Sequence, residues 1–215
     1  MEQCYSQGVA TRSYNSALRD EQARRTRITV LEAATRCFER DGYAATTMKA
    51  IAAEAGVSAQ TVFTQGAKPA LLLAAVDRGL TGDDEEVPLL AREAFQAFIA
   101  EQDRTRKLAM LRELAVGYYS GARAMLRVFR NAAGGDPELG AAWEEYERRR
   151  YQDIRTITES FAPMLRLDLD AATDVYWSIA GLEFVDGLIR VRGWTVEEYA
   201  DWLTEAVERL LLKDS

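Results

Sequence analysis

The sequence contains no histidine and only two cysteines among its 215 residues. Without histidine the chain cannot form a Ser-His-Asp or Cys-His catalytic arrangement, a histidine-bearing zinc site or the usual proton shuttle at neutral pH. Two cysteines do not make a disulfide framework, and no glycine-rich phosphate-binding loop is present. Cys37 lies in an apolar helical pattern, which indicates a buried thiol, with a thiol sensor as the alternative. We therefore expect no enzyme, no cofactor and no metal site.

Long apolar runs are missing as well. The longest, Leu71–Val76, is far shorter than the roughly 20 residues that a membrane-spanning helix needs. The first 20 residues are polar and lack the apolar core of a signal peptide. We therefore expect a cytoplasmic protein with no membrane partner, in which residues 1–20 form a flexible N-terminal arm.

Positively charged residues are fewer than negatively charged ones, with 27 Lys or Arg against 34 Asp or Glu. Residues 1–80 hold ten Lys or Arg and eight Asp or Glu, so this part has a net charge of +2 and the remainder −9. The distribution argues against nucleic-acid binding over the whole surface but permits one small basic face. The arginines near the N-terminus either reach phosphates from an arm or are solvated tail charges: Arg12, Arg19, Arg24, Arg25 and Arg27.

The segment from residue 28 to residue 72 carries the most informative pattern in the chain. Its first helix has apolar residues at spacings of three and four, which give it one packing face: Ile28, Leu31, Ala34 and Phe38. Asp41-Gly42 is a helix-ending signal. Thr47 is placed to cap a second, short helix with an apolar stripe of its own. Two helices of this kind predict a small helical unit.

A turn and a third helix follow. Gly56 permits a turn that a side chain would obstruct, and Ser58 is placed to cap the next helix. That helix, expected from Ala59 to about Gln65, buries Val62 and presents short or amide side chains: Ala59, Gln60, Thr61, Thr64 and Gln65. Glutamine can pair with adenine, and threonine can bond to bases or touch a thymine methyl, so such a helix fits the major groove. The pattern predicts a helix-turn-helix with double-stranded DNA as its partner.

At these residues the chain resembles the TetR family of transcriptional regulators. The resemblance covers about a fifth of the chain, from Ile28 onward: Thr46-Thr47, Ile51-Ala52, Ala55-Gly56-Val57-Ser58, Thr61-Val62-Phe63, Lys68 and Leu71-Leu72. It implies an all-α fold of about nine or ten helices, with an N-terminal three-helix helix-turn-helix DNA-binding domain and a C-terminal helical ligand-binding and dimerisation domain. It also implies a set of DNA-contacting residues: Thr47, Lys49, Ser58, Ala59, Gln60, Thr61, Phe63, Thr64, Gln65 and Lys68.

The chain departs from the usual pattern of that family at positions that normally touch the DNA backbone. Phe63 stands where a tyrosine is usual, so a hydroxyl that would donate to a phosphate is missing. Gln65 and Gly66 replace a frequent His-Phe pair, which removes an aromatic plug between the third and fourth helices. Pro69 is acceptable in a first helical turn, where its missing N–H costs little. Lys68 retains the phosphate-binding charge that the resemblance implies.

The remaining sequence is helical throughout, with no strand signal. We divide the chain into an arm over 1–20, a DNA-binding domain over 21–67, a connecting helix over 68–80 and a C-terminal domain over 81–215. The acidic stretch before Pro88 marks the boundary. Periodicity predicts further helices over 88–102, 104–119, 121–133, 137–161, 170–191 and 196–212. Asp136-Pro137 and the capping box Thr195–Glu198 mark two of the helix starts.

The last two predicted helices are apolar over more than one face, so one face requires either a partner or a place in the monomer core. In the TetR family the final two helices of each subunit form a four-helix dimer interface, and Gly181 with Ala180 would permit close approach of helices. A two-fold homodimer also matches a palindromic operator. The resemblance implies these interface residues: Tyr176, Ile179, Ala180, Glu183, Trp202, Leu203 and Leu210.

A third group of large apolar side chains lies on the helices between these two regions. Together they would suit a pocket for an apolar or aromatic effector, although each one taken singly is as well explained as core. The candidate lining is Phe95, Phe98, Met110, Leu114, Tyr118, Met125, Phe129, Trp143, Tyr146, Trp177 and Phe184. Tyr118, Tyr119 and Glu183 are candidate polar groups that would orient the ligand.

These patterns predict a ligand-responsive, dimeric DNA-binding transcriptional regulator, a repressor released from its operator by a small apolar or aromatic effector. The alternative from a different class is a module on the same fold that binds a small molecule or a protein partner and has lost operator recognition. An enzyme using the carboxylates of Glu144, Glu145 and Glu147 is disfavoured, because these residues with Arg148–Arg150 indicate a solvated helix face.

Overall fold

The computed structural model describes residues 7–82 and 87–214, with side chains from Leu18 onward. Over these residues the backbone is helical apart from turns and one isolated β-bridge, between Leu165 and Leu212, so the predicted all-α class is confirmed. None of the described helices is long and apolar enough to cross a membrane. The chain forms two compact units, one ending at Ala75 and the other beginning at Val76.

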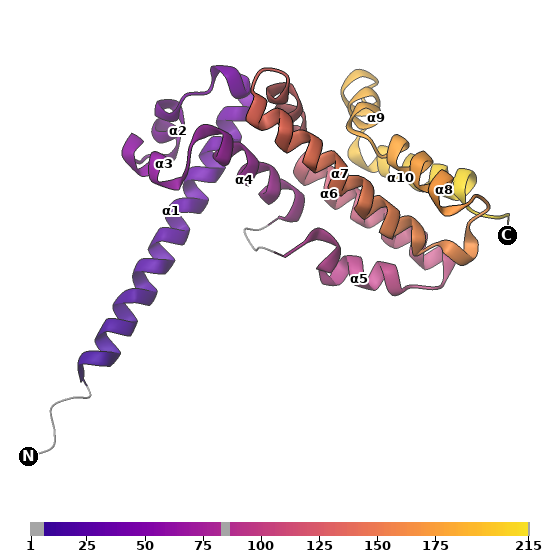
Figure 1. Ribbon diagram of the computed structural model, residues 1–215, viewed down its shortest axis with the longest axis horizontal. Coiled ribbons are helices and arrows are strands. Elements are labelled where there is room, and N and C mark those ends of the chain that lie inside the picture. The colour runs from indigo at the N-terminus through magenta and orange to yellow at the C-terminus, as the bar shows by residue number, and fades with distance from the viewer. Residues whose placement is uncertain (1–6, 83–86, 215) are drawn as a thin grey trace, which may run out of the picture. The chain divides into compact units, whose positions relative to one another are not determined.

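The N-terminal unit contains the predicted succession of helices (Figure 1). These are α1 (Gln7–Ala45), α2 (Met48–Ala55), α3 (Ala59–Gln65) and the start of α4 (Lys68–Thr81). The expected arm over 1–20 overlaps α1, which begins at Gln7, and residues 1–6 lie outside the described residues. Gly42 interrupts α1 with a φ of 77°, a left-handed conformation that glycine adopts without steric cost, so the helix-ending signal there had a physical basis.

The core of the N-terminal unit is formed by the apolar faces of its four helices. Its fully buried members are Val30, Ala33, Ala34, Cys37, Phe38, Ile51, Val62, Leu71 and Leu72. Thr46 is the buried polar member, and its hydroxyl donates to the carbonyls of Cys37 (3.1 Å) and Gly42 (2.8 Å) at the end of α1. Burial raises the pKa of the Cys37 thiol, as expected for a structural cysteine rather than a reactive one.

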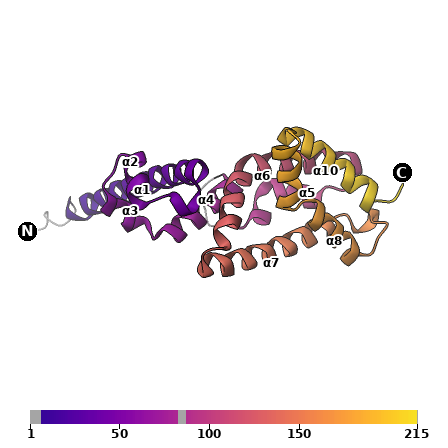
Figure 2. The ribbon, with the colours of Figure 1, turned by 90° about the horizontal axis from the view of Figure 1, so that it is seen from above.

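The C-terminal unit is a group of antiparallel helices (Figures 1 and 2). Its elements are η1 (Leu89–Ala91), α5 (Glu93–Ala100), α6 (Arg104–Ala133), α7 (Pro137–Glu159), η2 (Ala162–Met164), α8 (Leu169–Ile179), α9 (Leu182–Asp186), the π-helical turn η3 (Gly187–Val191) and α10 (Val196–Leu211). The helix α6 packs against α7, α7 against α8, α8 against α10 and α10 against α6, which encloses one core. The predicted starts at Asp136-Pro137 and at the Thr195–Glu198 capping box are confirmed.

Two predicted helices, over 104–119 and 121–133, are a single helix, α6. A glycine inside a helix costs only about 1 kcal/mol relative to alanine, which packing readily offsets. Gly121 remains helical at a point where α6 meets α4 backbone to backbone. A Cβ on Gly121 would overlap the carbonyl oxygen of Gly79, and a Cβ on Gly79 would lie 2.9 Å from the carbonyl oxygen of Gly121.

The helix predicted over 170–191 is broken instead, and the helix predicted over 88–102 begins as η1 and restarts at Glu93. Gly181 has extended backbone (ψ 150°) and separates α8 from α9. Two carbonyls at the end of α8 that lack a helical partner accept hydrogen bonds from phenols. Tyr119 donates to the Ala180 carbonyl (2.8 Å), and Tyr199 donates to the Ile179 carbonyl (2.9 Å). Tertiary hydrogen bonds therefore stabilise a break that helical periodicity could not reveal.

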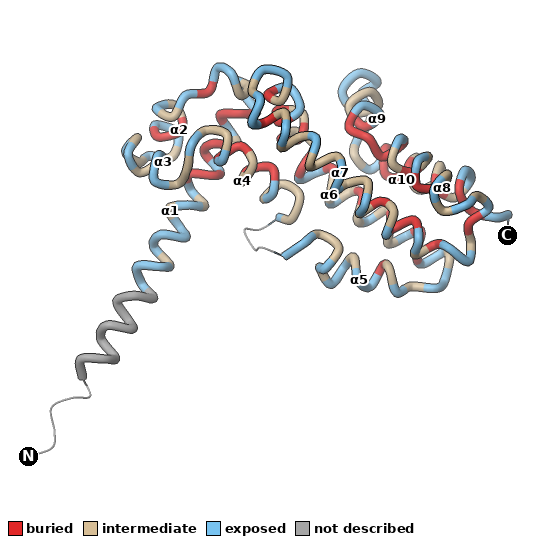
Figure 3. The backbone as a smooth tube through the Cα atoms, in the orientation of Figure 1, coloured by how far each residue is buried: buried red, intermediate tan, exposed pale blue. Residues whose placement is uncertain are grey.

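Burial in the C-terminal unit is concentrated on α6, α8 and α10, whereas α5 is largely exposed (Figure 3). One buried residue is a cation: the Lys107 side chain is fully buried and lies 5.0 Å from the ring centres of both Phe98 and Phe161. Its ammonium donates to the carbonyls of Ile99 (3.2 Å) and Glu101 (3.0 Å) at the end of α5. The cation thus caps a helix whose final carbonyls would otherwise be buried unpaired.

The contact between Gly79 and Gly121 yields a direct test of packing. We expect Gly121→Ala to lower the free energy of unfolding by about 1–3 kcal/mol, because the added methyl forces α4 and α6 apart. Gly117→Ala is the matched control, since Gly117 lies one turn earlier in α6 and its Cβ would meet nothing within 4 Å. That control should gain about 0.5–1 kcal/mol from helix propensity. Urea denaturation of both variants measures the difference, and equal stabilities would contradict the packing argument.

Candidate functional site

The helix-turn-helix is built by two side-chain caps and one glycine turn. Thr47 Oγ1 accepts from the backbone N–H of Ala50 (3.1 Å) at the start of α2. Ser58 Oγ accepts from the N–H of Thr61 (3.0 Å) at the start of α3. Between them Gly56 has left-handed backbone, with a φ of 67°. The two caps were predicted from sequence because each depends on residues three positions apart.

The predicted DNA-contacting residues of α3 are brought together on its outer face. Val62 is fully buried and anchors α3, while Gln60, Phe63 and Thr64 are exposed. Phe63 is 56% exposed, which is unusual for a ring of this size and leaves it available to a partner. Ala59, Thr61 and Gln65 are half-buried at the edges of this face.

The polar groups of α3 differ in what they are already bonded to. Thr64 Oγ1 donates to the carbonyl of Thr61 (2.7 Å), and the hydroxyls of Ser58 and Thr61 are 2.8 Å apart. Gln65 Nε2 donates to Thr64 Oγ1 (3.4 Å). Within the described part of the chain the Gln60 amide makes no hydrogen bond. Gln60 therefore offers both a donor and an acceptor to a base edge.

Lys68 has a structural role that the sequence did not indicate. Its ammonium donates to the carbonyls of Tyr43 (2.8 Å) and Thr46 (2.9 Å), and it lies 4.2 Å from the centre of the Tyr43 ring. These bonds tie the start of α4 to the end of α1. An ammonium has three donors, so one remains for a phosphate. The predicted phosphate contact of Lys68 stays a prediction.

The arginines of α1 are partly neutralised within the helix. Glu21 pairs with Arg24 (3.3 Å) and Arg25 (2.8 Å). Arg27 Nη1 donates to the Gln65 carbonyl at the end of α3 (3.4 Å). The side chain of Arg12 lies outside the described residues. Arg27 therefore lies beside α3, where a DNA backbone could reach it.

Four of the predicted ligand-lining residues form one aromatic cluster, which we call the α6–α7 aromatic cluster: Tyr118, Phe129, Trp143 and Tyr146. The hydroxyls of Tyr118 and Tyr146 are 2.8 Å apart. The ring centres of Phe129 and Trp143 are 5.2 Å apart, as are those of Trp143 and Tyr146. Burial raises the pKa of both Tyr118 and Tyr146, so both phenols are neutral at physiological pH and act as hydrogen-bond donors or acceptors.

The other predicted lining residues lie elsewhere. Phe98 packs with Phe161 beside Lys107, and Phe184 is 47% exposed and stacks on Trp202 with ring centres 6.0 Å apart. Met125 is buried in α6. Three more are half-buried around the core: Phe95, Met110 and Leu114. The structure therefore does not bring the candidate residues into one lining, because the break after α8 and the length of α6 distribute them along the unit.

Trp177 has a partner that the sequence interpretation missed. The Arg150 guanidinium lies 4.8 Å from the Trp177 ring centre, donates to the Trp177 carbonyl (3.3 Å) and pairs with Glu147 (2.9 Å). Only 12% of the Arg150 side chain is exposed, so the interpretation of Glu147 and Arg150 as part of a solvated face is wrong. The Trp177 Nε1–H is buried and has no acceptor among the described residues, so it is a free donor in the core.

The predicted dimer residues divide into buried and exposed groups. Four of them are buried in the core of the single chain and leave little surface for a partner: Tyr176, Ile179, Ala180 and Leu203. Ala180 and Gly181 form the break after α8 rather than a surface for close helix approach. The accessible members are Glu183, Trp202 and Leu210, together with two exposed apolar residues that the prediction did not include as interface: Phe184 and Val191.

Comparisons with known proteins agree with this geometry. Residues 30–75 match the family model for bacterial regulatory proteins of the tetR family. No curated protein matches the sequence. The structure is similar to NalD, the secondary repressor of the MexAB-OprM multidrug efflux pump in Pseudomonas aeruginosa, with a TM-score of 0.67 and 22% identity over 91% of this chain and 100% of that one.

Two further solved structures have the same fold. A protein from Saccharomonospora viridis in complex with choline gives a TM-score of 0.66 and 21% identity, covering 87% of this chain and 98% of that one. SmeT, the repressor of the SmeDEF multidrug efflux pump of Stenotrophomonas maltophilia, gives 0.62 and 18%, covering 88% and 91%. The predicted TetR-family resemblance and fold are confirmed. Regulators of this family are generally non-enzymatic DNA-binding proteins.

The bonds of Lys68 generate a stability prediction. We expect Lys68→Met to lower the stability of the N-terminal unit by about 1–3 kcal/mol, because two carbonyls at the end of α1 lose their charged donor. Lys49→Met is the matched control, since Lys49 is exposed on α2, and should change stability by less than about 0.5 kcal/mol. Thermal unfolding followed by circular dichroism measures both variants. Equal losses, or none, would show that Lys68 does not secure α4.

Proposed function

We propose that this protein is a dimeric DNA-binding transcriptional regulator of the cytoplasm, a repressor released from its operator by a small apolar or aromatic effector. The observation that carries the proposal is the outer face of α3, where Gln60 is exposed and unbonded on a helix fixed by a buried Val62 and a Ser58 cap. The match of residues 30–75 to the tetR family model supports the same assignment.

In the proposed complex α3 enters the major groove. Gln60 pairs with an adenine edge, and Thr64 contacts bases or a thymine methyl. The exposed ring of Phe63 lies against the DNA backbone, which Lys49 and the remaining donor of Lys68 also hold. Two copies related by a two-fold axis read half-sites about 34–36 Å apart or a multiple of that spacing. The proposed dimer surface is formed by apolar side chains of α9, η3 and α10, namely the exposed Phe184, Val191 and Leu210 and the partly buried Trp202.

The proposed effector site is the α6–α7 aromatic cluster together with Trp177 of α8, which packs on Arg150 of α7. Neutral phenols of Tyr118 and Tyr146 and the free Trp177 N–H suit an uncharged or weakly polar aromatic ligand. The similar solved structures include repressors of multidrug efflux pumps and a complex with choline, which supports a small-molecule effector in general. A coupling free energy of about 1–3 kcal/mol between effector and operator would give a usable switch.

The experiment that tests operator binding is selection from a genomic fragment library by the purified full-length protein at physiological salt. We expect a shared palindrome that Gln60→Ala no longer enriches, because the substitution removes both groups that read the base. Gln152→Ala, at an exposed glutamine of α7, is the matched control and should enrich the same sequence. A folded dimer that enriches nothing would favour the alternative, a ligand-binding or partner-binding module without an operator.

Phe63 provides a gain-of-function prediction. Phe63→Tyr restores a hydroxyl on an exposed face, so we expect operator affinity to rise by about 3–10-fold, the value of one hydrogen bond of about 1 kcal/mol. The gain should be present on the palindrome and on unrelated DNA alike, because a phosphate contact carries no sequence information. Fluorescence anisotropy with both duplexes measures it. A gain confined to the palindrome would assign the ring to base contact instead.

A further inference from the structure

Two mainly charged helical stripes face one another in the C-terminal unit. On α6 the members follow the spacing i, i+4, i+7 and i+8: Arg123, Arg127, Arg130 and Asn131. On α9 and η3 they follow i, i+3, i+4, i+7 and i+8: Glu183, Asp186, Gly187, Arg190 and Val191. Both spacings place their members on one side of a helix. Of these residues the aromatic and dimer predictions included Glu183 alone.

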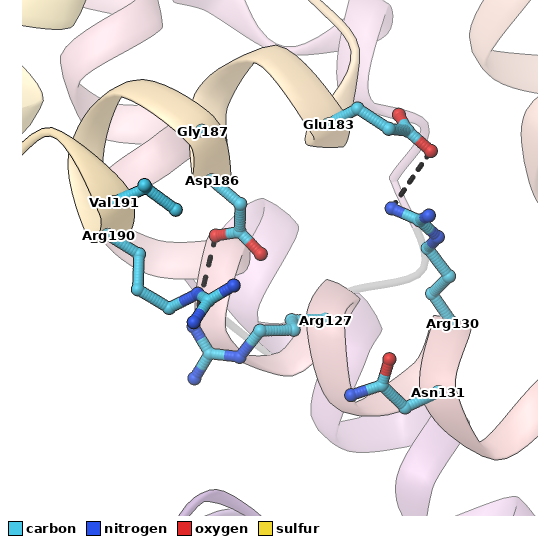
Figure 4. A pocket seen from close by; sticks show the side chains of 8 residues that line it. All are labelled: Arg127, Arg130, Asn131, Glu183, Asp186, Gly187, Arg190 and Val191. Carbon is cyan, nitrogen blue, oxygen red and sulfur yellow. Dashed lines mark ion pairs between the residues drawn. The ribbon is translucent and has the colours of Figure 1, made fainter.

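The stripes line an open pocket of about 650 Å³, a size that suits a small organic ligand (Figure 4). Its lining is Arg127, Arg130, Asn131, Glu183, Asp186, Gly187, Arg190 and Val191. A Cβ on Gly187 would meet nothing within 4 Å, so the backbone of η3 leaves this part of the pocket open. The lining holds three arginines against two carboxylates, with Arg123 as a fourth cation behind them.

The two carboxylates do not use up the donors of these arginines. Asp186 Oδ1 accepts a hydrogen bond from Arg123 Nη1 (3.3 Å). It also faces Arg127 Nη1 at 3.8 Å, which is beyond hydrogen-bond distance. Glu183 pairs with Arg130 at 2.8 Å. Arg190 makes no ion pair or hydrogen bond with another side chain in the described part of the chain. Figure 4 shows Arg127 and Arg190 reaching toward the same side of Asp186.

Guanidinium groups that converge with unused donors repel one another unless an anion lies between them. A planar guanidinium matches a carboxylate or a phosphate with two parallel N–H···O bonds. We propose that this pocket binds the oxyanion group, carboxylate or phosphate, of a small organic ligand. Arg127 and Arg190 donate to the oxyanion, and the Asn131 amide adds a neutral donor at the edge. Arg123 fixes the Asp186 carboxylate, whose charge attracts Arg127 from 3.8 Å.

The site is distinct from the α6–α7 aromatic cluster. Phe129 is buried and points into that cluster, whereas Arg127 and Arg130 on the same helix are partly exposed and line the pocket. The proposal therefore does not depend on DNA binding or on an aromatic effector. Val191, which is 69% exposed at the edge of the pocket, also belongs to the proposed dimer surface, so the competing occupant is a carboxylate of a second copy of this chain.

The test is isothermal titration calorimetry of the full-length protein with citrate and, separately, with inorganic phosphate, at constant ionic strength. We expect saturable binding of at least one probe, with one site per chain. Citrate alone would assign the site to carboxylates, phosphate alone to phosphoryl groups, and both to oxyanions in general. Arg127→Gln and Arg190→Gln should each weaken binding by about tenfold or more, the loss typical of a charge-assisted hydrogen bond.

Matched controls separate the pocket from general surface charge. Arg192→Gln removes the same charge two residues from Arg190, on an exposed side chain outside the lining, and should leave affinity within about twofold. Glu183→Gln removes the carboxylate that occupies Arg130 and should tighten binding. Retained helical content and unfolding temperature show that each variant is folded.

Two results would overturn the proposal: neither probe binds, or Arg192→Gln weakens binding as much as Arg190→Gln does. If neither probe binds, light scattering identifies the occupant. A dimeric wild-type protein whose Arg190→Gln variant dissociates into monomers would assign the pocket to a carboxylate of the second copy.

Discussion

The C-terminal unit depends on the hydrogen bonds that the carbonyls of Ile179 and Ala180 accept. A helix that ends inside a core leaves carbonyls unpaired, at a cost of about 1–3 kcal/mol for each. The phenols of Tyr199 and Tyr119 remove that cost from two different helices, α10 and α6. With the end of α8 satisfied, the chain can turn at Gly181, and α9 then directs its charged stripe toward α6. The break after α8 therefore permits the pocket that Arg127 and Arg190 line.

Cations cap other helix ends in the same way, each from a different helix. Lys68 donates to two carbonyls at the end of α1, and fully buried Lys107 does so at the end of α5. Arg150 donates to the Trp177 carbonyl near the end of α8. Each cation also lies over an aromatic ring, which partly compensates for the loss of water. Cations in this protein are structural parts as well as surface charges.

The contrast between caps explains what the sequence could predict. Thr47, Ser58 and Thr195 cap helices through bonds that span three residues, so their types and spacing identified them. The break at Gly181 and the continuity of α6 through Gly121 depend on partners far away in the sequence, which periodicity does not report. For the same reason the aromatic residues could be chosen by type but not assigned to one cluster, and no local pattern brought the pocket-lining arginines of α6 and η3 together.

The helix α6 carries both proposed ligand sites and also the contact with α4. Phe129 and Tyr118 belong to the aromatic cluster, and Arg127 lines the pocket. At Gly121 the α6 backbone meets that of Gly79 in α4 without an intervening side chain. Side chains absorb small displacements by changing rotamer, whereas two backbones in contact must move together or separate. If a ligand at either proposed site shifts α6, the contact between Gly121 and Gly79 passes that shift to α4. By linkage, whatever fixes α4 changes the affinity of each site by the factor with which a ligand at that site acts on α4, and this factor is set separately for each site.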